Sequence, residues 1–288
     1  MPMPISIRMF LKPVRLGVSC AALASCTALG AQEYGSNAAV IGQPSYADLA
    51  DLADGAPLVL RAEIKRQIAV DRERAPGLPA DVARLYVEAE TISLISGTVP
   101  VGESLKYLVD VPLDARGKVP KLKRSEVILF ARPVAGRPSE IQLVNQSAQL
   151  VWSADTEQRL RPILAELASA VAPPRVNGVR DAISVAGNLT GESETQVFLS
   201  TDSARPASIT VVRRPGMEPA WGVSFTEIVD RSASQPAPNS LAWYRLACSL
   251  PATLPREANL SSNDHDRSRA ASDYAYVMQS LGPCPRSL

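Results

Sequence analysis

The sequence predicts an α+β protein in which a small antiparallel β-barrel or sandwich is followed by a second, α+β domain. Three observations predict this class. Short strands with turn residues between them fill the first half of the chain, strands followed by helices fill the second half, and a proline-containing segment lies between the halves. An oligonucleotide/oligosaccharide-binding (OB) barrel is one form that the first half can take.

The β-rich domain is expected over residues 45–152. It begins with a short helix that Ser45 caps, and Asp48 completes a capping box three residues later. Residues 84–91 give the clearest strand, because their apolar and polar side chains alternate with the period of a half-buried antiparallel strand. The expected strands are residues 58–70, 84–91, 105–111, 126–133, 141–144 and 149–152.

A helix and a linker are expected over residues 153–174. The apolar residues of 155–171 have helical spacing, and Pro162 either kinks this helix or marks its true start near Arg161. The run Ala172-Pro173-Pro174-Arg175 is a natural linker, so we place the domain boundary there.

The second domain, residues 175–288, is expected to contain a meander of three antiparallel strands followed by two C-terminal helices. Capping residues place the start of the first helix at 239–240 and the start of the second at 262–263. The expected strands of the meander are residues 196–200, 207–213 and 221–229.

Residues 1–30 have the three parts of a cleavable secretory signal. Basic residues precede the apolar run 16–29, and Ala28 and Gly30 place small residues at the −3 and −1 positions of a cut after Gly30. The apolar run is shorter than the roughly 20 residues that a membrane-spanning helix needs, so an uncleaved anchor is the weaker interpretation. Residues 31–44 are small and polar and are expected to be disordered after cleavage.

A second cut site is open, because Leu23-Ala24-Ser25-Cys26 resembles the lipobox of bacterial lipoproteins. Cleavage there would make Cys26 the lipidated first residue of the mature chain. The simpler interpretation is that this apolar segment tolerates cysteine, since it also contains Cys20. We therefore expect a periplasmic or secreted protein, with attachment to the membrane through a lipid on Cys26 as the alternative.

The mature chain is nearly neutral. Loss of Arg8, Lys12 and Arg15 with the leader leaves 27 Lys and Arg against 29 Asp and Glu. This balance gives no electrostatic reason to bind nucleic acid. No apolar run after the leader approaches spanning length, so the mature chain is expected to have no transmembrane segment.

Cys248 and Cys284 are the only cysteines that remain after the ordinary cut. Two cysteines in an oxidising compartment usually pair, so we predict a disulfide between them that ties down the C-terminal tail. The alternative is a pair of free thiols.

The sequence predicts no catalytic residues, no cofactor and no metal site. His265, the one histidine, lies between acids at the expected start of the last helix, where polar residues are favourable without a metal. Residues 222–226 begin like a serine-hydrolase elbow but lack its second glycine. Glu192 and Glu194 could form the carboxylate pair of a glycosidase, yet alternate residues of a strand share one face, which is commonly the solvent face.

Aromatic residues are scarce, so residues 221–225 and the pair Trp243-Tyr244 raise a binding hypothesis. The simpler expectation is that they form the core of the second domain, with Trp243 near the disulfide, because aromatic side chains bury large areas.

Several runs resemble a family of uncharacterised exported bacterial proteins: 46–52 (YADLADL), 109–117 (VDVPLDARG), 191–199 (GESETQVFL), 221–230 (WGVSFTEIVD) and 241–250 (LAWYRLACSL). The resemblance covers most of the mature chain and implies no activity, cofactor or site residue. These observations together predict a non-catalytic envelope protein that binds an unidentified envelope protein or ligand. The alternative is an envelope hydrolase that works without histidine.

Overall fold

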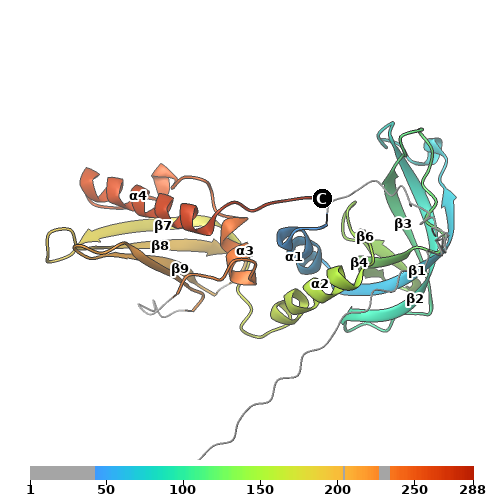
Figure 1. Ribbon diagram of the computed structural model, residues 1–288, viewed down its shortest axis with the longest axis horizontal. Coiled ribbons are helices and arrows are strands. Elements are labelled where there is room, and N and C mark those ends of the chain that lie inside the picture. Colours follow the sequence, from blue (N-terminus) through green and yellow to red (C-terminus); the bar gives the residue numbers. More distant parts are fainter. Residues whose placement is uncertain (1–42, 204, 227–233) are drawn as a thin grey trace, which may run out of the picture. The chain divides into compact units, whose positions relative to one another are not determined.

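The computed structural model describes residues 43–203, 205–226 and 234–288 (Figure 1). The predicted leader, both of its cut sites and most of the segment expected to be disordered lie outside the described residues. The described chain is mixed α+β, with a closed five-stranded β-barrel and a second antiparallel sheet that is followed by C-terminal helices. The α+β class is therefore confirmed.

The barrel strands follow the order β1-β2-β3-β5-β4, and β1 also pairs with β4, which closes the barrel. The pair β3–β5 is parallel and the other pairs are antiparallel. A short sixth strand pairs with β4. The strands are β1 (Leu58–Ala69), β2 (Val82–Gly97), β3 (Ser104–Pro112), β4 (Glu126–Val134), β5 (Arg137–Leu143) and β6 (Gln149–Val151).

β1 is a bent strand that pairs with β2 along one side and with β4 along the other. Its register against β2 shifts at three places, between Val59 and Leu60, between Arg61 and Ala62, and around Lys65. Bulges of this kind increase the twist and curvature that a small barrel needs. The inward side chains form a closed apolar core of their own, in which Leu60, Leu85 and Leu129 are fully buried.

Two helices flank the barrel in the chain. α1 (Tyr46–Gly55) begins with the predicted capping box between Ser45 and Asp48. α2 (Ala154–Leu167) contains Pro162 in its interior and begins at Ala154, so the alternative start near Arg161 is wrong. α2 ends before the expected residue 171, and Val171 is 83 % exposed instead of belonging to the apolar face.

The second sheet has four strands in the order β10-β9-β8-β7, so it contains the predicted antiparallel meander, as β8, β9 and β10, and one strand that was not predicted. The additional strand is β7 (Val176–Ala186), which starts directly after the proline run. Its alternation is interrupted by two register shifts, one at Gly178 and one next to Asp181, and this hides the strand in the sequence. The other strands are β8 (Ser193–Thr201), β9 (Ala207–Arg213) and β10 (Ala220–Ser224).

The C-terminal helices are α3 (Leu241–Ala247) and α4 (Asp264–Leu281), capped by Ser240 and Asn263 as expected. α4 lies along one face of the second sheet and contacts β7 and β8 (Figure 1). Two short 3-10 helices, Arg72–Arg74 and Arg256–Ala258, complete the regular structure. None of the helices in the described ranges combines the length and the apolar character needed to cross a membrane.

Two acidic residues of α1 accept hydrogen bonds from side chains of the C-terminal half of the chain. The Asp54 carboxylate accepts hydrogen bonds from both terminal nitrogens of Arg245 at 2.7 and 2.8 Å and from Nε of Arg175 at 2.6 Å. One turn earlier, Asp51 accepts a hydrogen bond from the Tyr244 hydroxyl. Burial alone would raise the pKa of Asp54, but the hydrogen bonds from the two arginines outweigh it and hold the pKa below its usual value.

The C-terminal tail is fastened at two points. The predicted disulfide joins Cys248, at the end of α3, to Cys284. Beyond it, the backbone N–H and the hydroxyl of Ser287 donate to Asp48 at 3.0 and 2.6 Å, and the Ser45 hydroxyl donates to the carbonyl of residue 285. Burial would raise the pKa of Asp48, yet the hydrogen bonds from Ser287 and Ser45 hold it below its usual value.

The division of the chain at residues 172–175 stays a prediction. One buried apolar cluster includes Leu49 of α1, Leu160 of α2, Val197 of β8 and Trp221 of β10. The barrel interior, by contrast, is a separate cluster. The helices of the first half therefore share a core with the second sheet.

Candidate functional site

An open groove with a volume of about 1180 Å³ crosses the outer surface of the barrel. It is lined by the end of β1, by β2, β3 and β5, and by residues that follow β1 and β5. Three buried residues of the barrel, Tyr107 and Val109 of β3 and Ile141 of β5, also border it.

A row of apolar side chains crosses the groove at right angles to the strands. Ile68 of β1 is in register with Tyr86 of β2, which is in register with Leu108 of β3. Ile68 and Leu108 are 42 % and 51 % exposed, whereas Tyr107 and Val109, the neighbours of Leu108 on the inward face of β3, are buried. Apolar side chains that gather at solvent-facing positions of three adjacent strands mark a surface that a partner can cover.

Ionic side chains lie on both sides of this apolar row. On one side the Arg84 guanidinium donates two hydrogen bonds of 2.7 Å to the Asp110 carboxylate, and this pairing raises the pKa of Arg84. On the other side Lys106 is in register with Glu88 of β2 and with Glu140 of β5. The apolar row is therefore framed by polar groups that can orient a ligand.

Two cations of the groove remain available to a ligand. Glu140 pairs with Arg137 at 3.0 Å, at an exposed position. Lys106 and Arg74 form no ion pair with any residue of 43–203, 205–226 or 234–288. The groove is lined by four cations and three acids and so has a small excess of positive charge: Arg74, Arg84, Lys106 and Arg137 against Asp71, Asp110 and Glu140.

Of the residues that the sequence raised for chemistry, Glu192 and Glu194 border one hollow, and His265 is not among its lining residues. His265 is exposed in the first turn of α4, and the part of the chain that the structure describes holds no group of three or more potential metal ligands. Glu192 lies in the turn between β7 and β8, and Glu194 points outward from β8, where it accepts a hydrogen bond from Gln196 at 2.8 Å. Both acids border a smaller hollow of about 500 Å³ on the outer face of the second sheet.

The aromatic residues of the second half belong to its core, as the simpler expectation had it. Trp221, Trp243 and Tyr244 are all less than a tenth exposed. The indole N–H of Trp243 donates to the carbonyl of Leu281 at 2.8 Å, close to the disulfide. Residues 222–224, which begin like a hydrolase elbow, lie within β10.

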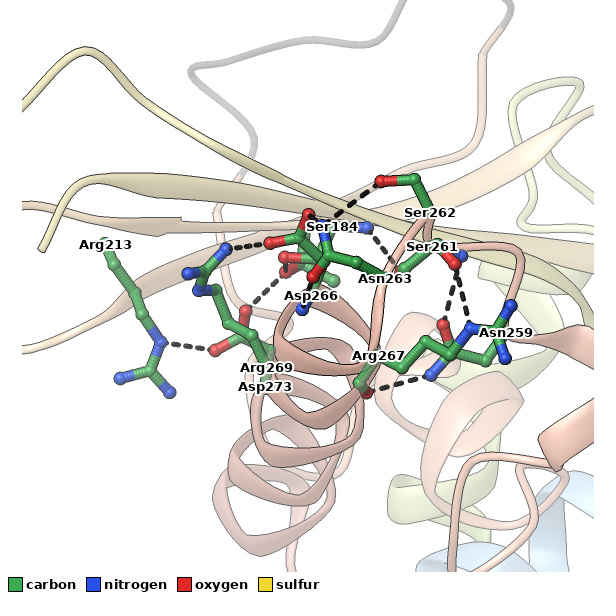
Figure 2. A network of polar contacts seen from close by, with 11 residues as sticks. Ser184, Arg213, Asn259, Ser261, Ser262, Asn263, Asp266, Arg267, Arg269 and Asp273 are labelled. Atoms are coloured by element: carbon green, nitrogen blue, oxygen red, sulfur yellow. Dashed lines mark hydrogen bonds and ion pairs between the residues drawn. The ribbon is translucent and has the colours of Figure 1, made fainter.

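A network of polar side chains under α4 is the second cluster that could suggest chemistry (Figure 2). Asp273 of α4 accepts a hydrogen bond from Arg213 of β9 and contacts the hydroxyl of Thr195, which lies 2.9 Å from the hydroxyl of Ser184. Asp273, Thr195 and Ser184 are almost fully buried. Since no substrate can reach the carboxylate or the hydroxyls, the network fixes α4 on the sheet.

No family model matches the chain, and no curated protein sequence matches it significantly.

The groove was not foreseen in the sequence, although one signal for it was present. Tyr86 stands on the otherwise charged face of residues 84–91, and Leu108 stands on the solvent face of the next strand. Apolar residues at such positions are exceptions to the pattern. Their alignment with Ile68 depends on register, which the alternation alone does not define.

Proposed function

We propose that the chain is an exported, non-catalytic binding module and that the groove on its barrel holds the ligand. The observation that carries this proposal is the row of Ile68, Tyr86 and Leu108 inside a groove of about 1180 Å³, in which Ile68 and Leu108 are exposed and Tyr86 is half-buried. Ligand sites in proteins are concave and mostly apolar, with a few polar groups that give orientation. The paired and unpaired charges beside the row supply those groups.

We also propose that the barrel is of the OB type. The order β1-β2-β3-β5-β4 with β1 paired to β4 is a five-stranded Greek-key closure, and the parallel pair β3–β5 is its crossover. OB barrels bind ligands on the face of strands 2 and 3, between the loops that follow strands 1 and 4. The groove lies on that face and touches Asp71 after β1 and Val134 at the end of β4. Tyr86 is its one outward aromatic residue, which disfavours single-stranded nucleic acid as the ligand, because such ligands need stacked aromatic platforms.

The rival function, an envelope hydrolase, has less support. Of the three acids that line the groove, Asp110 and Glu140 each have an arginine partner, and Asp71 belongs to the loop after β1. A general acid or base must contact its substrate directly, and each of these two carboxylates already accepts hydrogen bonding from an arginine.

Export is part of the same proposal. The Cys248–Cys284 disulfide supports an oxidising compartment, because disulfides are rare in the cytosol. The leader and the resemblance to exported bacterial proteins point the same way, toward a periplasmic or secreted protein, with a lipid on Cys26 as the alternative. The intact mass of the protein from its native host tests this. A mass that begins at residue 31 supports the ordinary cut, a lipid-modified mass that begins at Cys26 supports the anchor, and a full-length mass contradicts export.

Binding is tested with the mature chain, residues 31–288, its disulfide intact. Chitotriose and a nine-residue random peptide library are offered separately to the wild type, to Leu108→Glu and to the control Leu94→Glu. Leu94 is a suitable control because it is similarly exposed, at 45 % against 51 %, but lies outside the groove. We expect at least one probe to bind the wild type and the control and to lose tenfold or more affinity for Leu108→Glu. Equal binding to all three proteins, or cleavage of a bound probe, would contradict the proposal.

A further inference from the structure

The loop between β3 and β4, residues 113–125, concentrates positive charge. It contains five basic residues and one acid, a net charge of +4, so the rest of the mature chain carries a net charge of −6. A mature chain whose net charge of −2 was spread evenly would be repelled by an anionic surface, whereas this segregation gives it one segment that is attracted. All five basic side chains of the loop are exposed: Arg116, Lys118, Lys121, Lys123 and Arg124.

The cations of this loop are not neutralised by acids of the barrel. None of the five forms an ion pair with another residue that the structure describes. The adjacent strand β1 differs, because each of its three cations has a glutamate partner. The one acid of the loop, Asp114, accepts hydrogen bonds from the backbone N–H groups of Arg116 and Lys118 at 2.9 and 2.8 Å. The charge of the five side chains is therefore available to a partner.

The backbone of the loop is fastened to the barrel. Gln67 of β1 donates a hydrogen bond of 2.8 Å to the carbonyl of Pro120 and accepts one from the N–H of Leu122. Val119 and Leu122 pack against the core of the barrel, while the lysines beside them in the sequence are exposed. Because the loop is ordered before it meets a partner, binding does not require the loss of much backbone entropy.

Arg124 has a backbone conformation that favours glycine. Its φ is +71°, in the left-handed region, and its N–H donates to the carbonyl of Ile64 at 2.7 Å. A side chain at such a position strains the backbone, and glycine would relieve that strain. Strained residues that a fold tolerates are concentrated at functional sites. The arginine adds positive charge to the loop at the expense of stability, which points to a role for that charge.

We infer that the loop of residues 113–125 binds the surface of a membrane that contains anionic phospholipid, through electrostatic attraction to the headgroups. Each basic residue near such a surface strengthens binding roughly fivefold. The loop has no aromatic residue on which a base could stack, which disfavours single-stranded nucleic acid as the partner. The choice of a membrane rests on the proposed export, which the intact mass tests separately. The loop does not line the groove, so this contact is independent of the ligand of the groove.

The test measures co-sedimentation of the mature chain, residues 31–288 with the disulfide intact and no lipid, with vesicles of pure phosphatidylcholine or of phosphatidylcholine with one-third phosphatidylglycerol. The loop is altered by the double substitution Lys121→Gln and Lys123→Gln. The matched control is Arg214→Gln with Arg256→Gln, which removes the same charge from exposed positions that have no ion pair with a described residue. Arg124→Gly is a third variant, because it removes one charge of the loop and relieves backbone strain. Dextran sulfate, a soluble anionic polymer, is offered separately to the wild type.

We expect the wild type and the control to bind the phosphatidylglycerol vesicles with affinities within twofold of each other and not to bind pure phosphatidylcholine. The double lysine variant should bind at least tenfold more weakly. A rise in salt from about 0.05 M to about 0.5 M should abolish binding of the wild type, because salt screens exposed charges. Arg124→Gly should bind at least threefold more weakly although its thermal unfolding midpoint is no lower than that of the wild type. This result would separate the loss of charge from a loss of structure.

Three results would overturn the inference. The wild type could bind both kinds of vesicle alike, the loop variants could bind as the wild type does, or the control could lose as much affinity as the double lysine variant. Binding of dextran sulfate without binding of the phosphatidylglycerol vesicles would refute the membrane as the partner of the loop. A full-length intact mass from the native host would refute export, and it would do so whatever the vesicles show.

Discussion

Removal of the Cys248–Cys284 disulfide should destabilise the protein and release its C-terminal tail from α1. The perturbation is the double substitution Cys248→Ser and Cys284→Ser, which leaves no unpaired thiol. The two cysteines are 36 residues apart in the chain, so the chain-entropy model gives a loss of about 3.8 kcal/mol in the free energy of unfolding. For a chain of this size that corresponds to a fall of roughly 8–15 °C in the unfolding midpoint.

The release of the tail has its own signature. Ser287 donates two hydrogen bonds to the buried carboxylate of Asp48, and hydrogen bonds to charged groups contribute about 1.5–3 kcal/mol. Ser287→Ala removes the hydroxyl bond and keeps the backbone bond, so we expect a loss of about 1.5 kcal/mol in the disulfide-bonded protein. In the double serine variant the tail is free, and the same substitution should cost less than about 0.5 kcal/mol.

Urea unfolding followed by tryptophan fluorescence measures both effects, since Trp243 packs close to the disulfide. Wild-type protein in excess dithiothreitol serves as a second route to the same state and should match the double serine variant. A loss below about 1.5 kcal/mol on removal of the disulfide, or a Ser287→Ala effect that is equal in both backgrounds, would refute the reasoning.

Three further perturbations test the packing of the helices. Arg245→Ala leaves the half-buried Asp54 with Arg175 alone, and loss of one partner from a buried ion pair costs about 3–5 kcal/mol, to be measured by urea unfolding. The pKa values of Asp48 and Asp54 are lowered on folding, so both carboxylates stabilise the folded state fully above the ordinary carboxyl pKa near 4. This stabilisation is lost as the pH falls through the lower pKa values of the folded protein. The free energy of unfolding measured from pH 6 to pH 2 should therefore fall, and it should fall less in Asp54→Asn. Asp273→Ala removes the buried acceptor under α4 and should cost about 3 kcal/mol or more, whereas a loss under 1 kcal/mol would contradict a structural role for the network.

Local signals in the sequence predicted much of the fold. The capping box at Ser45 and the alternation of residues 84–91 act over a few residues, and the structure contains both of them. The disulfide followed from cysteine number and compartment, without geometry. Such features depend on neighbours in the chain or on simple chemistry, which explains why they can be derived from the sequence.

Features that depend on long-range pairing were missed. β7 is interrupted at Gly178 and near Asp181, so its identity as a strand comes from its partner β8 and not from its own pattern. The end of α2 and the exposure of Val171 likewise follow from tertiary packing. The groove was hidden for the same reason, since Ile68, Tyr86 and Leu108 come from three strands that only register brings together.

The central claim is that the groove on the barrel is where the exported protein holds its ligand. A photo-reactive benzoylphenylalanine placed at Tyr86, an aromatic position inside the groove, tests it in the native host, with the same residue at Leu94 as the control. After irradiation, the intact mass of the recovered mature protein is measured for both. The account predicts a covalent adduct from position 86 and none from position 94. Equal adducts from the two positions, or an adduct from position 94 alone, would contradict it.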